Sequence, residues 1–272
     1  MFDHPGLAAL SAIIAHGSFE AAAAALGVTQ SAVSQRIRSL EELVGSPVLQ
    51  RGVPSTPTAI GLRLFRHAEE VARLEAGLIG DLGVKAQKPL AVRIATNADS
   101  LATWLVAALA GPDGYLFELV VDDQDHSADL LRRGEVTAAI TAHGAPVQGC
   151  DTHPLGALRY IATASPDFAA RWFPDGPNAG ALARAPALVF DEKDRLQSTW
   201  AARIAGQPVA LPRHRMPSTT AFVEAAERGL GWGLNPEPLV RRSLADGRLV
   251  ALSDDPFDTP LFWQVSRIGK AA

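Results

Sequence analysis

The stretch FEAAAAALGVTQSAVSQRIRSLEE, residues 19–42, reads as two helical segments separated by a turn at Gly27. Thr29 is a good N-cap for a second helix that starts at Gln30. Small Ala23 beside the turn lets the two helices cross closely, which a bulky side chain would prevent. Both segments repeat apolar residues at helical spacing: Phe19, Ala22, Ala23 and Leu26 in the first, and Val33, Ile37 and Leu40 in the second. The pattern predicts a helix-turn-helix.

The outward side of the second segment carries hydroxyl, amide and guanidinium groups, which can hydrogen-bond base edges in a major groove. The start of that helix, with its free N–H groups, can take a phosphate. An ordinary helical hairpin with a solvated face is the alternative. The turn, the small residue, the core positions and the polar set all agree with a DNA reader, so we predict DNA contacts from Thr29, Gln30, Ser31, Ser34, Gln35, Arg36 and Arg38.

Outward from this stretch, PVLQRGVPSTPT at 47–58 offers two short extended pieces around Gly52, as a wing would, and adds Arg51 to the predicted DNA contacts. A long amphipathic helix is predicted from Thr58 to about Leu82. Its apolar stripe consists of Ile60, Leu64, Ala68, Val71, Leu74, Leu78 and Leu82. The first turn or two should pack on the winged domain. The rest has little of its own chain to cover it, which favours a dimer that presents two recognition helices about one DNA turn apart.

The composition by itself gives no sign of a nucleic-acid partner. The 272 residues carry 25 basic and 29 acidic side chains, a net charge of −4, and residues 1–87 hold 7 basic and 8 acidic ones, a net of −1. The single Cys150 cannot form an internal disulfide, and neither a secretory signal nor an apolar run of about 18 residues occurs. We expect a cytoplasmic protein of two or three domains that does not contact a membrane.

From residue 88 onward, predicted strands and helices alternate, which favours a parallel α/β sheet in two lobes. The chain should cross between the lobes near Gly156 to Arg159 and return near Pro256 to Pro260. The expected domains are 1–57 for the winged helix-turn-helix, 58–87 for the linker helix and 88–272 for the α/β domain, with lobe I at about 88–157 and 259–272 and lobe II at about 158–258.

Ligands of such sheets lie beyond the carboxyl ends of the strands. The segments found there are NADS at 97–100, DDQD at 122–125, AHGA at 142–145, DEKD at 191–194, PSTT at 217–220 and NPEP at 235–238. Three are rich in carboxylates with no comparable basic cluster, so the cleft should prefer a cation. The helix start at Ser100 and the hydroxyls of Ser218 to Thr220 can hold a carboxylate. A basic amino acid carries both groups, whereas the alternative for DDQD and DEKD is a solvated acidic loop that caps a helix.

Residues 18–51 and TAIG at 58–61 resemble the N-terminal domain of LysR-type transcriptional regulators. NADSLATWL at 97–105, LRRGEV at 131–136, LGAL at 155–158, FDEKD at 190–194 and TAFVEAAERG at 220–229 resemble the subgroup called ArgP, LysG or IciA. The resemblance implies a winged helix-turn-helix, a dimerising linker helix and an effector domain shaped like a periplasmic binding protein. It also implies a regulator that senses lysine or arginine, activates a basic amino acid exporter gene, forms dimers or dimers of dimers and works with RNA polymerase.

Carried over by position, the family's effector contacts fall on Asn97, Ser100, Asp123, Gln124, Ser218, Thr219 and Thr220. We expect Ser100 and nearby N–H groups to hold the α-carboxylate, while Asp123, Asp191 or Asp194 faces the cationic end. Asp99 is a further candidate, although capping the helix is an ordinary role for an Asp there. No cofactor is expected besides the effector. The family's usual last helix has no counterpart after PLFWQVSRIGKAA at 260–272, which should leave apolar surface exposed or in an oligomer contact.

An enzyme is the main alternative class. The seven histidines form no pair at metal-ligand spacing, Cys150 has no evident base beside it, and GLGWG at 229–233 lacks the dinucleotide fingerprint. No nucleophile elbow is present. A transporter's solute-binding protein would share the two lobes but needs export, which the helix-turn-helix contradicts. A LysR-type regulator of another amino-acid or small-molecule pathway is the nearer alternative.

Overall fold

The computed structural model describes residues 2–50, 52, 54–82, 89–112, 114–122, 127–133 and 135–266. The chain divides into two compact units, the first reaching Leu90 and the second running from Ala91 to Ser266. We describe each unit by itself. Among the described residues, no helix combines the length and apolar character needed to cross a membrane.

The first unit is a winged helix-turn-helix followed by a long helix. Its helices are α1 (His4–His16), α2 (Phe19–Leu26), α3 (Gln30–Val44) and α4 (Ala59–Asp81), and its wing strands β1 (Leu49–Gln50) and β2 (Thr56–Pro57) pair antiparallel. Ser18 Oγ accepts a hydrogen bond from the Ala21 N–H, and Thr29 Oγ1 accepts one from the Ala32 N–H. Gly27 turns the chain with φ 65°, a left-handed conformation that glycine tolerates. The predicted helix-turn-helix is confirmed.

The apolar stripe of α4 is buried only near its start. Leu64 is 7% exposed in the core of the winged domain, where Phe65 and Ala68 also pack. Gly61 lies so close to the wing that a Cβ there would stand 1.8 Å from the Val48 carbonyl oxygen. Further along, Leu74, Leu78 and Leu82 are 51%, 59% and 68% exposed. The prediction that only the first turns pack on the winged domain is confirmed.

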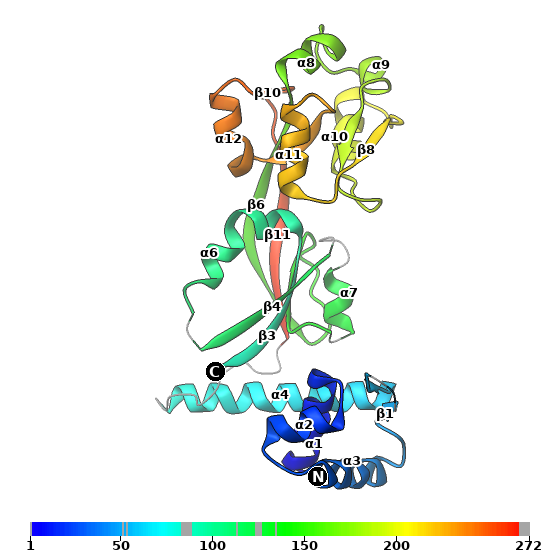
Figure 1. The fold of residues 1–272 in the computed structure, drawn as a ribbon. Helices are drawn as coiled ribbons and strands as arrows, with labels where there is room; N and C mark the ends of the chain where they lie inside the picture. The colour runs from blue at the N-terminus through cyan, green and yellow to red at the C-terminus, as the bar shows by residue number, and fades with distance from the viewer. Residues whose placement is uncertain are drawn as a thin grey trace. The chain divides into compact units, whose positions relative to one another are not determined.

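The second unit is an α/β structure of two lobes (Figure 1). Lobe I contains β3 (Leu90–Thr96), β4 (Tyr115–Val121), β5 (Ala138–Thr141) and α7 (Ser127–Arg132). A continuous helical segment follows β3, made of α5 (Ala98–Ser100), a π-helical turn (Leu101–Leu105) and α6 (Val106–Leu109). Lobe II contains β7 (Ala187–Val189), β8 (Arg213–Arg215), β9 (Gly233–Pro236), β10 (Val250–Ala251), α8 (Pro166–Trp172), α9 (Ala179–Leu182), α10 (Leu196–Ala205), α11 (Thr219–Glu227) and α12 (Glu237–Ala245). The sequence pattern had predicted neither α8 nor α9.

Two long strands, β6 (Cys150–Ala164) and β11 (Phe257–Ser266), run side by side from one lobe to the other (Figure 1). They pair antiparallel through the crossing region, where Tyr160 lies opposite Phe257 and Leu158 opposite Thr259. The crossing points predicted near Gly156 to Arg159 and Pro256 to Pro260 lie in this paired region. β11 also pairs antiparallel with β5, and β6 pairs antiparallel with β9 and β10.

The prediction of a parallel sheet is therefore wrong for most of the strand pairs whose register is described. β3 with β5, and β7 with β8, are parallel, while the pairs made by β6 and β11 are antiparallel. A strand that returns between the lobes must run against the strand that left. Alternation of strands and helices along a sequence does not reveal that reversal. In lobe II the core centres on Trp200 and Trp232, both fully buried, with ring centroids 5.0 Å apart.

Candidate functional site

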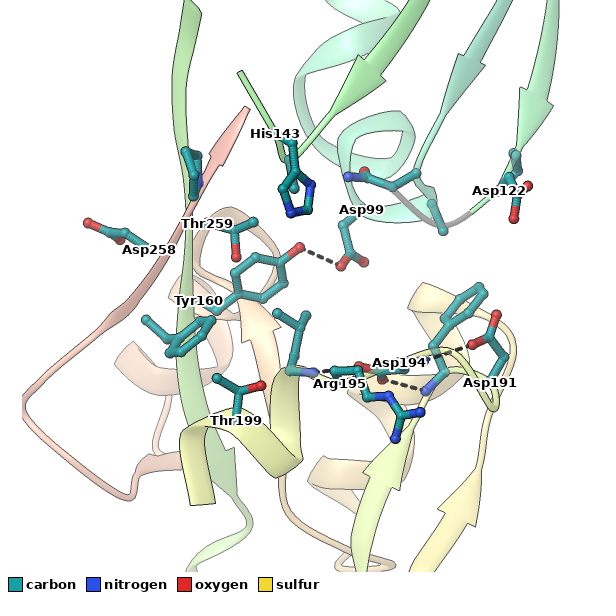
Figure 2. A pocket seen from close by; sticks show the side chains of 18 residues that line it. Asp99, Asp122, His143, Tyr160, Asp191, Asp194, Arg195, Thr199, Asp258 and Thr259 are labelled. Carbon is teal, nitrogen blue, oxygen red and sulfur yellow. Dashed lines mark hydrogen bonds between the residues drawn. The ribbon is translucent and has the colours of Figure 1, made fainter. Parts of the chain in front are cut away.

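A cavity of about 600 Å³ lies in the second unit between the two lobes. Lobe I contributes residues that follow the ends of β3, β4 and β5, namely Asn97, Asp99, Asp122 and His143. Lobe II contributes the segment around Asp191 to Thr199, and the crossing strands contribute Tyr160, Asp258 and Thr259 (Figure 2). The lobe I residues lie there because the carboxyl ends of strands in an α/β sheet open toward a ligand crevice.

Asn97, not Asp99, caps the helix after β3. Its Oδ1 accepts a hydrogen bond of 2.6 Å from the Ser100 N–H. The capping role considered for Asp99 is therefore wrong. Ser100 is fully buried and does not line the cavity, and its Oγ has no hydrogen-bond partner among the described residues. The structure thus directs the Ser100 N–H to Asn97 and places the hydroxyl in the interior.

Asp99 connects the two lobes. Its carboxylate accepts a hydrogen bond from Tyr160 Oη at 2.8 Å (Figure 2). It accepts a second one from Thr219 Oγ1, at the start of α11, at 3.4 Å. The pKa of Asp99 is raised to about 6, mainly by burial and also by the nearby Asp194, while the hydrogen bonds from the two hydroxyls lower it. Asp99 is thus a half-buried carboxylate whose hydrogen bonds come from neutral groups.

Five carboxylates line the cavity: Asp99, Asp122, Asp191, Asp194 and Asp258. Lys193 Nζ lies 2.9 Å from Asp122, which forms a second link between the lobes. Arg159 donates two hydrogen bonds of 2.9 Å to Asp258 and lowers the pKa of that carboxyl. With Arg195 and His143 as the basic residues of the lining, the cavity is predominantly acidic and suits a cation.

The carboxylates of lobe II are held by backbone groups. Asp191 Oδ1 accepts hydrogen bonds from the N–H groups of Lys193 and Asp194, at 2.7 and 3.0 Å. Asp194 accepts from the N–H groups of Phe190 and Leu196, at 2.8 and 3.0 Å. Both are therefore oriented by the turn that precedes α10.

Of the predicted effector residues, the structure brings Asn97, Asp99, Asp191 and Asp194 together around the cavity. Thr219 reaches Asp99, whereas Ser218 is exposed and caps α11 by accepting from the Ala221 N–H. Thr220 borders a separate hollow with Val223 and Glu224. Asp123 and Gln124 lie outside the described residues.

The predicted effector contacts left out several residues that line the cavity: Asp122, His143, Tyr160, Arg195, Thr199, Asp258 and Thr259. Asp122 and His143 do lie in DDQD at 122–125 and AHGA at 142–145, two of the segments predicted to lie where a ligand binds. Arg195 and Thr199 start the helix that follows DEKD. Tyr160, Asp258 and Thr259 reach the cavity through the antiparallel pairing of β6 with β11, which the local sequence pattern does not predict.

In the first unit, the predicted DNA contacts lie at the start and on the outer face of α3. Thr29, Gln30, Ser31, Gln35 and Arg38 are exposed. Ser34 and Arg36 are half-buried, and Arg51 lies outside the described residues. Within the first unit, these residues therefore lie on the outer face of α3, and their contact with DNA stays a prediction.

Comparison with known proteins gives a consistent result along the chain. Residues 6–62 match the family of bacterial regulatory helix-turn-helix proteins of the lysR type, and residues 90–267 match the LysR substrate binding domain. The chain is 44% identical over 263 residues to the transcriptional regulator LysG of Mycobacterium tuberculosis, covering 96% of this chain and 87% of that protein. It is 45% identical over 276 residues to the regulator ArgP of Pseudomonas aeruginosa, covering 99% and 91%.

Two solved structures are similar over nearly their whole length. A crystal structure of ArgP from Mycobacterium tuberculosis aligns with a TM-score of 0.83 at 43% identity, covering 98% of this chain and 92% of that one. Full-length LysG from Corynebacterium glutamicum with bound effector Arg aligns with a TM-score of 0.69 at 36% identity, covering 97% and 92%.

Proposed function

The chain belongs to the LysR family of DNA-binding transcriptional regulators, which are not enzymes, and we propose its function from this premise. We propose that it senses a basic amino acid, lysine or arginine, in the cavity between its lobes. In response it activates the gene of a basic amino acid exporter. The observation that carries the proposal is the acidic lining, with five carboxylates around about 600 Å³. A relative that is 36% identical holds Arg as its effector, which supports the same ligand class.

The proposed effector contacts are Asn97, Asp99, Asp191 and Asp194, with Asp122, His143 and Tyr160 added from the cavity lining. The proposal keeps Asp123 and Gln124, next to Asp122 in the sequence, and Thr219 through its hydrogen bond to Asp99. A basic amino acid offers a cation for the carboxylates and a carboxylate for donors such as Arg195.

The proposed DNA contacts are the exposed and half-buried polar residues of α3 with Thr29 and Arg51. We place the DNA-binding domain at 1–57, the linker helix at 58–87 and the effector domain at 88–272. The regulator works in the cytoplasm as a homodimer or a dimer of dimers that engages RNA polymerase. The exposed leucines of α4 support self-association, because an apolar helix face of this kind is buried most simply against its own copy.

Thermal unfolding of the full-length protein tests the effector assignment. A ligand that binds only the folded state at 100 times its Kd stabilises it by about 2.7 kcal/mol, so lysine or arginine should raise the melting temperature. Alanine, which carries only one positive charge, and citrate, which carries none, should not raise it. If no basic amino acid produces a shift, the effector class is wrong and the alternative of another small-molecule pathway takes its place.

A further inference from the structure

A small extension adjoins the main cavity. It shares Asp99, Phe190, Asp194 and Leu196 with that cavity and has a volume of about 20 Å³. We call it the annex. Its volume accommodates one water-sized group and excludes a planar guanidinium or a carboxylate. The group that occupies the annex must therefore be about the size of one water molecule.

The annex contains an acceptor that no described residue satisfies. Gln197, in the first turn of α10, lines the annex and is 1% exposed. Its Oε1 is buried and has no hydrogen-bond partner in the part of the chain that the structure describes. An unpaired buried amide oxygen destabilises a protein, so its retention at a cavity wall points to a ligand that donates to it.

The annex is also negatively polarised. Asp99, on the wall shared with the main cavity, receives hydrogen bonds from two neutral hydroxyls, those of Tyr160 and Thr219, and lies near a second carboxylate, Asp194. A buried carboxylate in such surroundings gains most from a cation. A neutral water would satisfy Gln197 but would leave the charge of Asp99 uncompensated.

A group of one heavy atom that carries positive charge and several N–H donors is a primary ammonium, which has three donors and no acceptor. We infer that the annex is a primary-ammonium subsite, in which Asp99 supplies the counter-charge and Gln197 Oε1 the neutral acceptor. The inference rests on the proposed function, because it takes a basic amino acid as the ligand. The ammonium comes either from the α-position of lysine or arginine or from the end of the lysine side chain.

Titration calorimetry on the full-length protein with lysine, norleucine and 6-aminohexanoate tests the subsite. Norleucine carries only the α-ammonium, and 6-aminohexanoate carries only the terminal one. Gln197→Met keeps the length of the side chain but removes the acceptor oxygen, so lysine should bind at least about tenfold more weakly. The melting temperature of the ligand-free variant should stay level or rise, because an unpaired buried oxygen has been removed. A purely structural role for Gln197 would instead lower that temperature, and this result would overturn the inference.

Asp99→Asn should weaken lysine binding by at least about tenfold, since it keeps the shape and removes the counter-charge. The matched controls are Gln207→Met and Asp175→Asn, both at exposed positions away from the cavity, and both should bind lysine as the unsubstituted protein does. If the α-ammonium occupies the annex, Gln197→Met should weaken the binding of norleucine and leave the binding of 6-aminohexanoate unchanged. If the terminal ammonium occupies the annex, the substitution should weaken the binding of 6-aminohexanoate and leave that of norleucine unchanged.

The outcomes separate the two proposals. Lysine binding that is unchanged in both cavity variants would overturn the annex while leaving the proposed function in place. An unsubstituted protein that binds neither lysine nor arginine would overturn the proposed function itself.

Discussion

The surroundings of Asp99 disfavour its charged carboxylate form, and for this reason we expect effector binding to depend on pH. Burial raises the pKa of Asp99 from 3.8 to about 6. The folded protein therefore binds more protons here than the unfolded chain between these two values. The stability contributed by protonated Asp99 is fully present below pH 3.8 and is lost as the pH rises through 6.

The carboxylate form is the one that attracts a cation, so we predict that lysine affinity is level above pH 7 and falls below pH 6. At pH 5, about one unit below the pKa of Asp99, binding should be about tenfold weaker than at pH 8. Titration calorimetry between pH 5 and pH 8 measures the lysine affinity, and in Asp99→Asn this step in affinity with pH should be absent. The other charged or titratable groups that line this cavity are Asp122, His143, Tyr160, Asp191, Asp194, Arg195 and Asp258. A step that persists in Asp99→Asn and disappears in His143→Gln would assign it to the histidine.

The sequence identified Asp99 as a candidate but not what it does. Its hydrogen-bond partners, Tyr160 and Thr219, lie 61 and 120 positions away, and only the folded lobes bring them together. The role of Gln197 is even harder to predict from the sequence. A glutamine in an amphipathic helix is read as a solvated residue, and its burial at a cavity wall follows from packing that no local pattern encodes.

Among the elements, α3 has the face most directly tied to function. We predict that Arg38→Ala weakens specific binding to the DNA upstream of the regulated gene by about ten- to a hundredfold, because Arg38 is exposed on the face that would enter the major groove. Fluorescence anisotropy at fixed salt measures the loss. Arg184→Ala, which removes one exposed charge from lobe II, is the control for net charge. Unchanged specific affinity would remove Arg38 from the DNA-reading set.

The elements also show where prediction from the sequence works. The helix-turn-helix follows from spacings of three and four residues, a cap and a glycine turn, all within 24 residues, and the structure confirms it. The direction of the strands in the second unit depends on contacts between residues about 100 positions apart, such as Arg159 with Asp258. The residue types in a strand do not show whether it runs parallel or antiparallel to its neighbour. The expectation of a parallel sheet was wrong for this reason.

At the scale of the whole molecule, the exposed stripe of α4 is the surface through which we propose that copies of the chain associate. We predict that Leu78→Glu lowers the sedimenting mass toward that of one chain at micromolar concentration, because a buried carboxylate at an apolar interface is costly. Leu230→Glu changes a leucine in lobe II that is 44% exposed and should leave the mass unaltered. A Leu78→Glu protein of unchanged mass would place the contact between copies elsewhere.

The pairing of β6 with β11 bears on how quickly the effector domain can respond. Hydrogen bonds join the two strands from Tyr160 and Phe257 to Gly156 and Leu261, and the register shifts only after Leu261. A two-stranded ribbon of this kind resists stretching but bends readily, so the lobes can change their angle without breaking the ladder. No local unfolding is required, and hinge motions of that sort occur within microseconds to milliseconds. A change of angle would instead have to break the bonds that cross the cavity, those of Asp99 with Tyr160 and Thr219 and that of Lys193 with Asp122.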